Sequence, residues 1–260
     1  MLSKAEGNLK GQVAVVTGGS SGIGRATCLA LARSGASVVV VGRTDSRVQE
    51  VVGQVRQLGA ESCALGLALD VRQERDMEEM ACQTLARFHR IDILIACAGI
   101  GKGDTERLLP YAVAAMPIGE WEEVVGTNLK GVFLSNRAVL PSMIRQRGGT
   151  IINISSARGG RFGSPYASAY CASKFGVIGL SESLAEEVRE FGIKVHVVLP
   201  DVTDTPIWGK GPGPERFGKS LSPSCVADLI IYLLCQPDDV VVPNPLITSA
   251  ENSFWFRGRG

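Results

Sequence analysis

The sequence predicts an α/β fold in which a parallel, doubly wound sheet carries helices on both faces. Two kinds of periodicity alternate along the 260 residues. Short runs of β-branched and apolar residues match strands that are buried on both sides, and the segments between them repeat apolar residues at helical spacing. Strand, helix and strand in that order, with right-handed crossovers, cover both faces of one sheet. We therefore expect a single domain over residues 1–260.

The elements follow in order along the chain. Strands are expected at residues 13–17, 37–41, 91–96, 150–154 and 194–199, with a further strand before Asp70. Two long connections, 99–117 and 200–220, follow strand ends, where open α/β sheets bind ligands, so they are expected to form the substrate side. The first three helices are indicated by apolar stripes of Ile23, Ala26, Ala30 and Leu31, then Val48, Val51, Val52 and Val55, then Met77, Met80, Ala81, Thr84 and Phe88.

Composition excludes several classes of function. The chain has 27 Lys and Arg against 26 Asp and Glu, and the net charge of +1 provides no field for nucleic acid or an anionic membrane. No apolar stretch reaches the about 18 residues of a membrane span, and residues 1–10 lack the apolar core of a secretory signal. The seven cysteines form no CxxC pair, which predicts reduced thiols in a cytoplasmic protein, without disulfides or a metal site.

A glycine-rich turn follows the first expected strand. Residues 17–24 read Thr-Gly-Gly-Ser-Ser-Gly-Ile-Gly, and the first helix starts near Ile23. Glycine is needed where a turn is tight or where backbone must approach a pyrophosphate, and the N–H groups and dipole at a helix start attract phosphate. An ordinary strand-to-helix turn is the alternative. The position directly between strand and helix favours phosphate binding.

A tyrosine and a lysine share one face of a later helix. Tyr170 and Lys174 are four residues apart, which places them about one turn from each other. A free tyrosine, with a pKa of about 10, is a poor acid or base at neutral pH, and a neighbouring ammonium lowers that pKa by favouring the phenolate. We therefore expect Lys174 to lower the pKa of Tyr170, and Tyr170 to exchange a proton with the substrate.

Together the two motifs resemble those of the short-chain dehydrogenase/reductase family. The glycine spacing in residues 18–24 is GxxxGxG, Tyr170 and Lys174 give YxxxK, and the resemblance extends over roughly residues 10–204. The resemblance implies a Rossmann-like fold, a nicotinamide cofactor, and hydride transfer between a carbonyl and a secondary alcohol. It also implies a homodimer or homotetramer formed through the helices around Asn128 and Tyr170.

The resemblance further implies which residues contact the cofactor. NAD-preferring members carry an acid where this chain has Gly42, and Arg43 follows at the position that binds a 2′-phosphate. NADP is therefore expected over NAD, unless Arg43 merely begins a solvated loop. Asp70 matches a contact to adenine, or else caps the next helix. The expected cofactor contacts are Gly18, Ser20, Ser21, Gly22, Ile23, Gly24, Arg43, Asp70, Val71, Ala98, Gly99, Tyr170, Lys174, Pro200, Thr203 and Thr205.

The same resemblance completes the expected catalytic set of Asn128, Ser156, Tyr170 and Lys174. Ser156 matches the serine that hydrogen-bonds the substrate oxygen and stabilises charge developing there. Ser155 is the alternative, because the spacing from Ser156 to Tyr170 is one residue longer than the common pattern. Asn128 matches an asparagine that holds a water joining the lysine to solvent. Lys174 is also expected to reach the nicotinamide ribose.

Two positions depart from the family pattern. Cys97 replaces an asparagine that braces the turn after a central strand, and Asp201 replaces the glycine of a Pro-Gly turn. The Asp201 carboxylate either favours the positively charged, oxidised nicotinamide or points to solvent, and we expect the second. Arg158 and Arg161 either attract an anionic substrate or are solvated loop charges, and again we expect the second.

These observations predict an NADP-dependent oxidoreductase that acts on a small carbonyl or alcohol. A 3-oxoacyl thioester reductase is an alternative within the enzymes, although residues 243–250 are more like the ending of members that act on small hydroxy acids and similar alcohols. The rival class is a nucleotide-binding regulator on the same fold, whose cofactor reports redox state. Cys97 and Asp201 favour that rival, whereas the intact Ser156, Tyr170 and Lys174 favour an enzyme.

Overall fold

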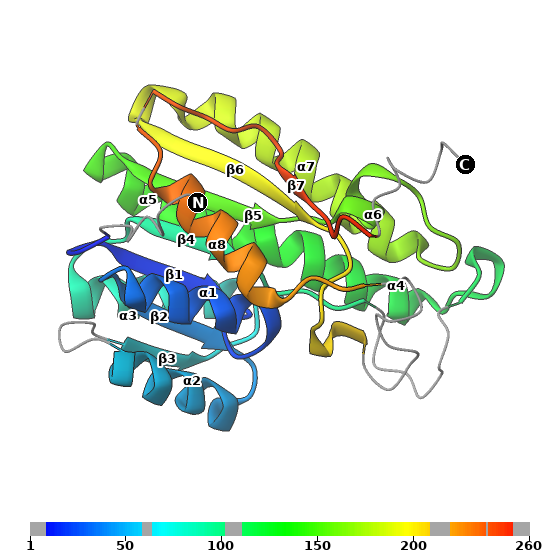
Figure 1. Ribbon diagram of the computed structural model, residues 1–260, viewed down its shortest axis with the longest axis horizontal. Coiled ribbons are helices and arrows are strands. Elements are labelled where there is room, and N and C mark those ends of the chain that lie inside the picture. Colours follow the sequence, from blue (N-terminus) through cyan, green and yellow to red (C-terminus); the bar gives the residue numbers. More distant parts are fainter. Residues whose placement is uncertain (1–8, 59–63, 102–110, 209–218, 238, 252–260) are drawn as a thin grey trace.

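The computed structural model describes residues 9–58, 64–101, 111–208, 219–237 and 239–251. In these residues seven parallel strands form a sheet in the order β3-β2-β1-β4-β5-β6-β7, with helices on both faces (Figure 1). The predicted doubly wound α/β fold is confirmed. The strands are β1 (Val13–Thr17), β2 (Ser37–Gly42), β3 (Ala64–Ala68), β4 (Ile93–Ala96), β5 (Gly149–Ile154), β6 (Ile193–Pro200) and β7 (Leu246–Ile247).

The helices alternate with the strands and end where the sequence turns polar or breaks. A π-helical turn, η2 (Gly126–Lys130), joins α4 to α5, and short 3-10 turns cover Val113–Ala115, Arg189–Phe191 and Pro206–Trp208. The α-helices are α1 (Gly22–Arg33), α2 (Asp45–Leu58), α3 (Glu74–Phe88), α4 (Ile118–Val125), α5 (Gly131–Gln146), α6 (Ala157–Arg161), α7 (Ser168–Val188) and α8 (Pro223–Leu234).

The core consists of two apolar layers, one on each face of the sheet. In β2, Val38 and Val40 belong to one layer while Val39 and Val41 belong to the other, and all four are fully buried. Alternate residues of a strand point to opposite faces, so an unbroken apolar run fits a strand that is covered on both sides. The valine run therefore predicted this strand correctly.

One predicted strand starts later than expected. The strand within the predicted run 91–96 is Ile93–Ala96, and the Asp92 backbone before it hydrogen-bonds to Val13 and to Thr150. The Asp92 carboxylate accepts hydrogen bonds from the Val13 backbone N–H at 2.8 Å and from the Arg90 guanidinium. This turn ties the start of β4 to the start of β1.

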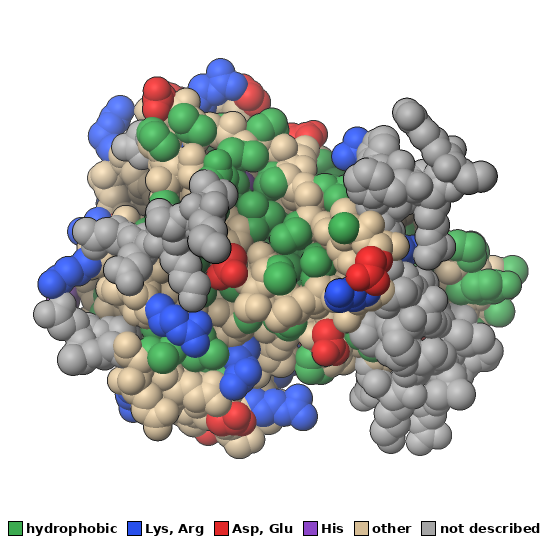
Figure 2. Space-filling view, in the orientation of Figure 1, with side chains coloured by type: hydrophobic (Ala, Val, Ile, Leu, Met, Phe, Trp, Pro, Cys, Tyr) green, Lys and Arg blue, Asp and Glu red, His purple; other side chains and the backbone are tan. Residues whose placement is uncertain are grey.

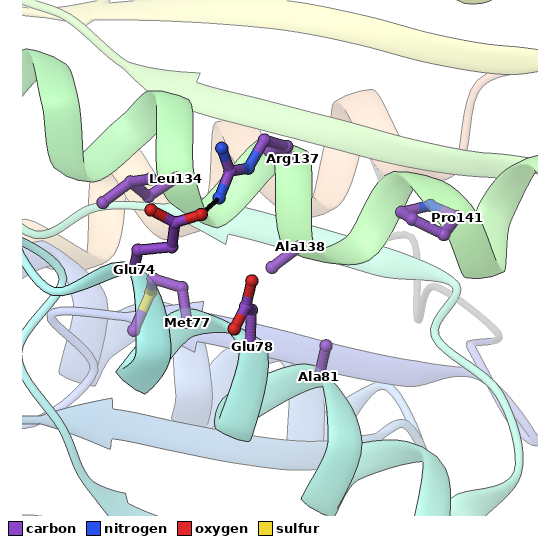
Figure 3. A pocket seen from close by; sticks show the side chains of 8 residues that line it. All are labelled: Glu74, Met77, Glu78, Ala81, Leu134, Arg137, Ala138 and Pro141. Atoms are coloured by element: carbon purple, nitrogen blue, oxygen red, sulfur yellow. Dashed lines mark hydrogen bonds and ion pairs between the residues drawn. The ribbon is translucent and has the colours of Figure 1, made fainter.

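A surface groove runs between α3 and α5 (Figure 3). Glu74 of α3 forms an ion pair with Arg137 of α5 across it, and the groove encloses about 460 Å³. None of the expected site residues lines this groove, which is therefore separate from the predicted active site. Its walls are formed by Glu74, Met77, Glu78, Ala81, Leu134, Arg137, Ala138 and Pro141.

The face that carries α1 and α8 shows scattered charges of both signs between apolar side chains (Figure 2). This mixture is consistent with the net charge of +1. Within the described part of the chain, no helix combines the length and the hydropathy that crossing a membrane would need.

Candidate active site

The glycine-rich turn packs tightly against the end of β4. Gly18 has φ of +67°, and a Cβ atom on it would lie 2.7 Å from the Ala98 Cα atom. A Cβ atom on Gly24 would lie 2.2 Å from the Gly18 carbonyl oxygen. Side chains are excluded at both positions, so the sequence forces this turn to pack against Ala98 at the carboxyl edge of the sheet.

The start of α1 suits an anion. Ser21 is the N-cap residue, but its side chain makes no capping hydrogen bond, and the first turn of α1 contains no acidic residue. Uncapped N–H groups and the positive end of the helix dipole favour a phosphate group at such a terminus. The residues present therefore fit a dinucleotide pyrophosphate.

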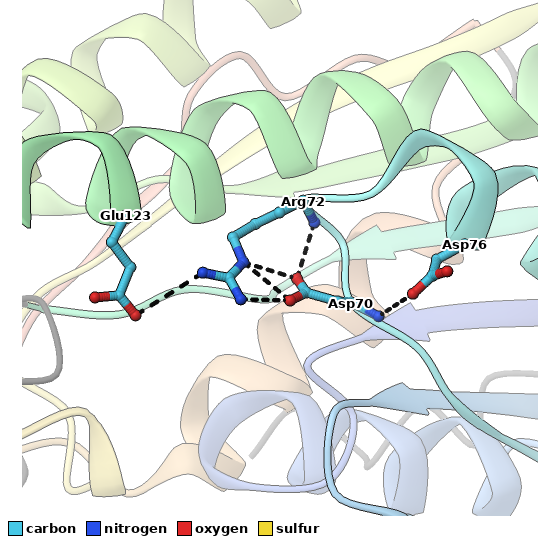
Figure 4. A network of polar contacts seen from close by, with 4 residues as sticks. All are labelled: Asp70, Arg72, Asp76 and Glu123. Carbon is cyan, nitrogen blue, oxygen red and sulfur yellow. Dashed lines mark hydrogen bonds and ion pairs between the residues drawn. The ribbon is translucent and has the colours of Figure 1, made fainter. Parts of the chain in front are cut away.

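Asp70 lies beyond β3 in a polar network with Arg72 (Figure 4). The Arg72 guanidinium donates to both Asp70 carboxylate oxygens at 2.6–3.0 Å, and the Arg72 backbone N–H donates to one of them at 3.0 Å. Burial raises the pKa of Asp70, but the hydrogen bonds and charge of Arg72, with a contribution from Arg43, outweigh it and hold the pKa below its ordinary value. Asp70 is therefore ionised beside two cations.

The alternative role of Asp70 as a helix cap is wrong. The N-cap of α3 is Gln73, and the Asp70 carboxylate turns back to the Arg72 backbone N–H. The acid that caps a free N–H here is Asp76, which accepts from the Asp70 backbone N–H at 2.8 Å. Arg43 is exposed directly after β2, close enough to influence Asp70.

Ser156, Tyr170 and Lys174 meet at the carboxyl end of β5. Ser156 is the N-cap of α6, and its side chain lies close enough to Tyr170, in the first turn of α7, to influence the pKa of the phenol. The Lys174 Nζ atom donates to the Ile154 carbonyl at 2.9 Å and lies 5.8 Å from the centre of the Tyr170 ring. The Ser155 hydroxyl turns away and donates to the Lys174 backbone carbonyl at 2.8 Å. Ser156 rather than Ser155 therefore contacts the tyrosine.

The pKa of Tyr170 departs from the sequence prediction. Burial raises it, against the hydrogen bond from Ser156, so the expected lowering by Lys174 is wrong for this structure. Lys174 is itself only 4% exposed, and burial lowers its pKa to about 8. Spacing on a helix indicated which groups are neighbours, but burial of both side chains determines the direction of each pKa change.

Asn128 braces the turn that follows β4. This residue is fully buried within η2, where its Oδ1 atom accepts from the Ile100 N–H at 2.8 Å. Its Nδ2 atom donates to the Ile100 carbonyl at 2.9 Å and to the Ser173 hydroxyl at 3.1 Å. An asparagine inside a helix is locally unfavourable, and these bonds offset that preference. The turn thus keeps a brace although Cys97 carries no amide.

The Cys97 thiol is half-buried beside Lys174 and the start of α1. Burial raises the pKa of Cys97 to about 11, and the lysine charge and the Gly24 backbone N–H lower it only in part. The thiolate is the reactive form of cysteine, so at neutral pH this group is an inert thiol. The substitution at position 97 therefore adds no reactive group to the site.

The segment after β6 differs most from the prediction. Asp201 does not point to solvent: its side chain is 8% exposed and accepts from Arg158 Nε at 2.8 Å and from the Thr248 hydroxyl at 2.7 Å. The Thr203 hydroxyl donates a hydrogen bond to the Asp201 backbone carbonyl at 2.8 Å. Thr205 contacts the glycine turn, since a Cβ atom on Gly22 would lie 3.1 Å from the Thr205 side chain.

A small hollow adjoins Tyr170, with room for about one water molecule. Glu120 of α4 is one of its walls, and the Glu120 Oε2 atom is buried without a hydrogen-bond partner among the described residues. Glu120 carries no sequence signal of such a position, because an acid in the first turn of a helix is usually a surface residue. The other walls are Gly101, Met116, Val124, Tyr166, Ala167, Ala169 and Tyr170.

The two long connections are described only in part. Residues 102–110 of the first and 209–218 of the second lie outside the described residues. The described ends, residues 99–101 and 201–208, contact Asn128 and the glycine turn respectively.

Comparison with known proteins decides the family. The family model described as short chain dehydrogenase matches residues 12–212. The chain belongs to the short-chain dehydrogenase/reductase family. It is an enzyme, an oxidoreductase of that family, as the two sequence motifs predicted.

Relatives within the family act on several carbonyl and alcohol compounds. The 3-oxoacyl-[acyl-carrier-protein] reductase of Thermotoga maritima is 34% identical over 241 residues, which cover 90% of this chain and 94% of that protein. The alcohol dehydrogenase of Thermococcus sibiricus, complexed with 5-hydroxy-NADP, has a TM-score of 0.82 at 28% identity, over 92% of this chain and 97% of that chain. The 3-ketoacyl-(acyl-carrier-protein) reductase of Brucella melitensis, complexed with NADH, has a TM-score of 0.80 at 28% identity, over 92% and 96%.

Proposed function

We propose that this oxidoreductase interconverts a carbonyl and a secondary alcohol with NADP as its cofactor, and that Tyr170 is the general acid and base. The observation that carries the proposal is the contact of Ser156 with Tyr170, with Lys174 one turn further along α7, at the sheet edge that also holds the glycine turn. These three groups are those that proton transfer beside a hydride transfer requires.

The proposed mechanism assigns a separate task to each side chain. The bound nicotinamide supplies or accepts the hydride. The Ser156 hydroxyl donates to the substrate oxygen and stabilises the charge that develops there. The Tyr170 hydroxyl gives its proton to that oxygen during reduction, and the Tyr170 phenolate accepts the proton of the alcohol during oxidation. Lys174 orients the ribose and holds positive charge near the phenol, and Asn128 fixes the turn at Ile100 and holds a water near Lys174.

The residues expected to hold the cofactor line the same edge of the sheet. We propose that the turn from Gly18 to Ile23 and the start of α1 bind the pyrophosphate, where no acidic side chain opposes it. Asp70 and Val71 would contact the adenine, Ala98 and Gly99 the adjacent ribose, and Pro200, Thr203 and Thr205 the nicotinamide. For Thr203 this needs the backbone, because its hydroxyl is already engaged.

The preference for NADP rests on Arg43. This side chain is exposed at the end of β2, where Gly42 presents no acid to repel a 2′-phosphate. We expect Arg43→Ala to raise the KM for NADPH on the order of 10- to 100-fold, since a hydrogen bond to a charged group is lost, and to leave the KM for NADH unchanged. Initial-rate kinetics with both cofactors measure this. Arg47→Ala, in the exposed face of α2, is the matched control, and an unchanged preference in Arg43→Ala would contradict the assignment.

A substrate panel tests the proposed activity. Loss of NADPH absorbance is followed with simple ketones, quinones, keto acids and 3-oxoacyl thioesters, and turnover of any class supports an oxidoreductase of that specificity. The 3-oxoacyl thioesters are the second candidate class, because the chain is similar to reductases that act on them. Tight NADPH binding with no turnover across the panel would favour the rival, a nucleotide-binding regulator.

We also propose that the enzyme is a homodimer or homotetramer of the cytoplasm, with both binding and catalysis in a single domain over residues 1–260. Phe133 on α5 and Phe175 on α7 are 43% and 46% exposed, and apolar side chains on these two helices suit an interface between copies of the chain. The proposed compartment rests on the seven cysteines of the sequence, which form no CxxC pair. Light scattering during gel filtration gives the oligomeric state.

A further inference from the structure

The Asp201 carboxylate links three separate segments of the chain. Asp201 directly follows β6, and its backbone N–H donates to the Ile247 carbonyl of β7 at 2.9 Å. One carboxylate oxygen accepts from the Thr248 hydroxyl at 2.7 Å, and the other accepts from Arg158 Nε at 2.8 Å. With the side chain 8% exposed, these bonds replace the water that an ionised carboxylate would otherwise hold.

Arg158 brings the short helix α6 into this link. It is the second of the five residues of α6, and the N-cap of that helix is Ser156. The Ser156 Oγ atom accepts from the Gly159 backbone N–H at 3.2 Å, so the hydroxyl and the helix backbone move together. A helix of this length is not stable alone, and its position must come from tertiary contacts.

The backbone of α6 also lies against the catalytic tyrosine. A Cβ atom on Gly159 would lie 2.5 Å from Cε1 of the Tyr170 ring, so the glycine allows direct contact between the ring and the helix. A Cβ atom on Gly160 would lie 2.3 Å from the Ser155 hydroxyl. Displacement of α6 would therefore move Ser156, which caps this helix, and would also change the packing of the Tyr170 ring against Gly159.

We infer that Asp201 is a positioning residue, which holds α6 through Arg158 so that Ser156 and Tyr170 stay in register. The kinetic part of this inference rests on the proposed function. Asp201 stands where the family pattern has glycine, and a glycine has no side chain with which to hold an arginine. In this chain an ion pair thus connects α6, whose N-cap is Ser156, to the residue that follows β6.

Kinetics of single and double variants test the inference. Asp201→Gly and Arg158→Met are each expected to lower kcat on the order of 10- to 100-fold, as misplacement of reacting groups does, with the dissociation constant of NADPH unchanged. The double variant should be no worse than either single variant, because both remove the same link. Should Asp201→Gly fail to fold, Asp201→Asn keeps the shape, weakens the bond to Arg158, and should give a smaller loss of kcat.

The matched control is Arg137→Met. Arg137 forms an ion pair with Glu74, and its side chain is 45% exposed, the same fraction as that of Arg158. Removing that pair between α3 and α5 should leave kcat unchanged. If the pair of Asp201 and Arg158 contributed only to stability, Asp201→Gly and Arg158→Met would lower the melting temperature and leave both kcat and the dissociation constant of NADPH unchanged.

Hydrogen exchange gives a readout that does not depend on turnover. Backbone amides of residues 157–161 should exchange faster in Asp201→Gly and Arg158→Met than in the wild type, and at the wild-type rate in Arg137→Met. Unchanged exchange in α6, wild-type kcat in both single variants, or multiplied losses in the double variant would overturn the inference. If the wild type turns over no panel substrate, the proposed function fails, while the exchange measurement still decides whether Asp201 holds α6.

Discussion

Replacing Tyr170 with phenylalanine is expected to lower kcat on the order of a thousandfold, within the range for loss of a general acid or base. The substitution keeps the ring that packs against Gly159 and removes the hydroxyl that contacts Ser156. NADPH affinity should change far less than kcat, because the hydroxyl that is removed acts on the substrate oxygen. Steady-state kinetics with the best substrate of the panel, together with NADPH titration, measure both quantities.

The matched control for this variant is Tyr166→Phe. Tyr166 lies four residues earlier, is 62% exposed, and also borders the hollow beside Tyr170. It has no lysine four residues further on, and its hydroxyl has no proposed role, so kcat should be unchanged. Turnover of Tyr170→Phe within tenfold of the wild type would exclude the tyrosine as the acid and base, and Ser156 would then be the next group to test.

Replacing Lys174 with methionine is expected to abolish most activity and to stabilise the protein at pH 7. The ammonium is 4% exposed, and its pKa in the folded state is about 8, against an ordinary value of 10.5. At about 1.4 kcal/mol per pKa unit, this difference means that burying the charged form costs about 3 kcal/mol. Methionine fills similar volume without that cost, so Lys174→Met should have the higher free energy of unfolding at pH 7.

The effect of Lys174 on stability has a defined sign with pH. Between pH 8 and 10.5 the unfolded chain binds the lysine proton while the folded chain has lost it, so the free energy of unfolding of the wild type rises with pH through this window. Urea denaturation at several pH values should show the advantage of Lys174→Met at pH 7 and below, and its disappearance above pH 10.5. Lys130→Met, an exposed position in η2, should follow the wild type. An equal difference between wild type and Lys174→Met at all pH values would refute the lowered pKa.

The fold could be predicted from the sequence because its main signals are local. The valine run of β2 reads directly as a strand covered on both faces, and the glycine turn follows from residues that cannot carry a side chain there. The start of β4 could not be placed as well. The first two residues of the predicted run, Ile91 and Asp92, are apolar and polar in a pattern that a strand allows. The hydrogen bond from the Val13 backbone N–H to the Asp92 carboxylate joins positions far apart in the chain.

The sequence predicted which groups of the candidate site lie close together, but not their electrostatics. Helical spacing brought Tyr170 and Lys174 together, whereas the depth at which each is buried depends on the whole fold. Spacing left Ser155 and Ser156 as alternatives, and the cap geometry of α6 distinguishes them. The pairing of Arg158 with Asp201 was missed because each charge, taken alone, resembles a solvated loop residue.

The strand order influences how the protein folds and how well it resists proteolysis. The centre of the sheet joins β1 to β4, strands roughly 80 residues apart, and contacts of such long range form late and slowly. The glycine turn follows the first of these strands, and Asn128 and Tyr170 lie beyond the second. A chain in which β1 and β4 have not paired therefore lacks a complete nucleotide site, and a ligand that binds the complete site shifts the population towards the native state by mass action. Cofactor supply would then influence not only the rate of turnover but also how long each molecule survives against proteolysis.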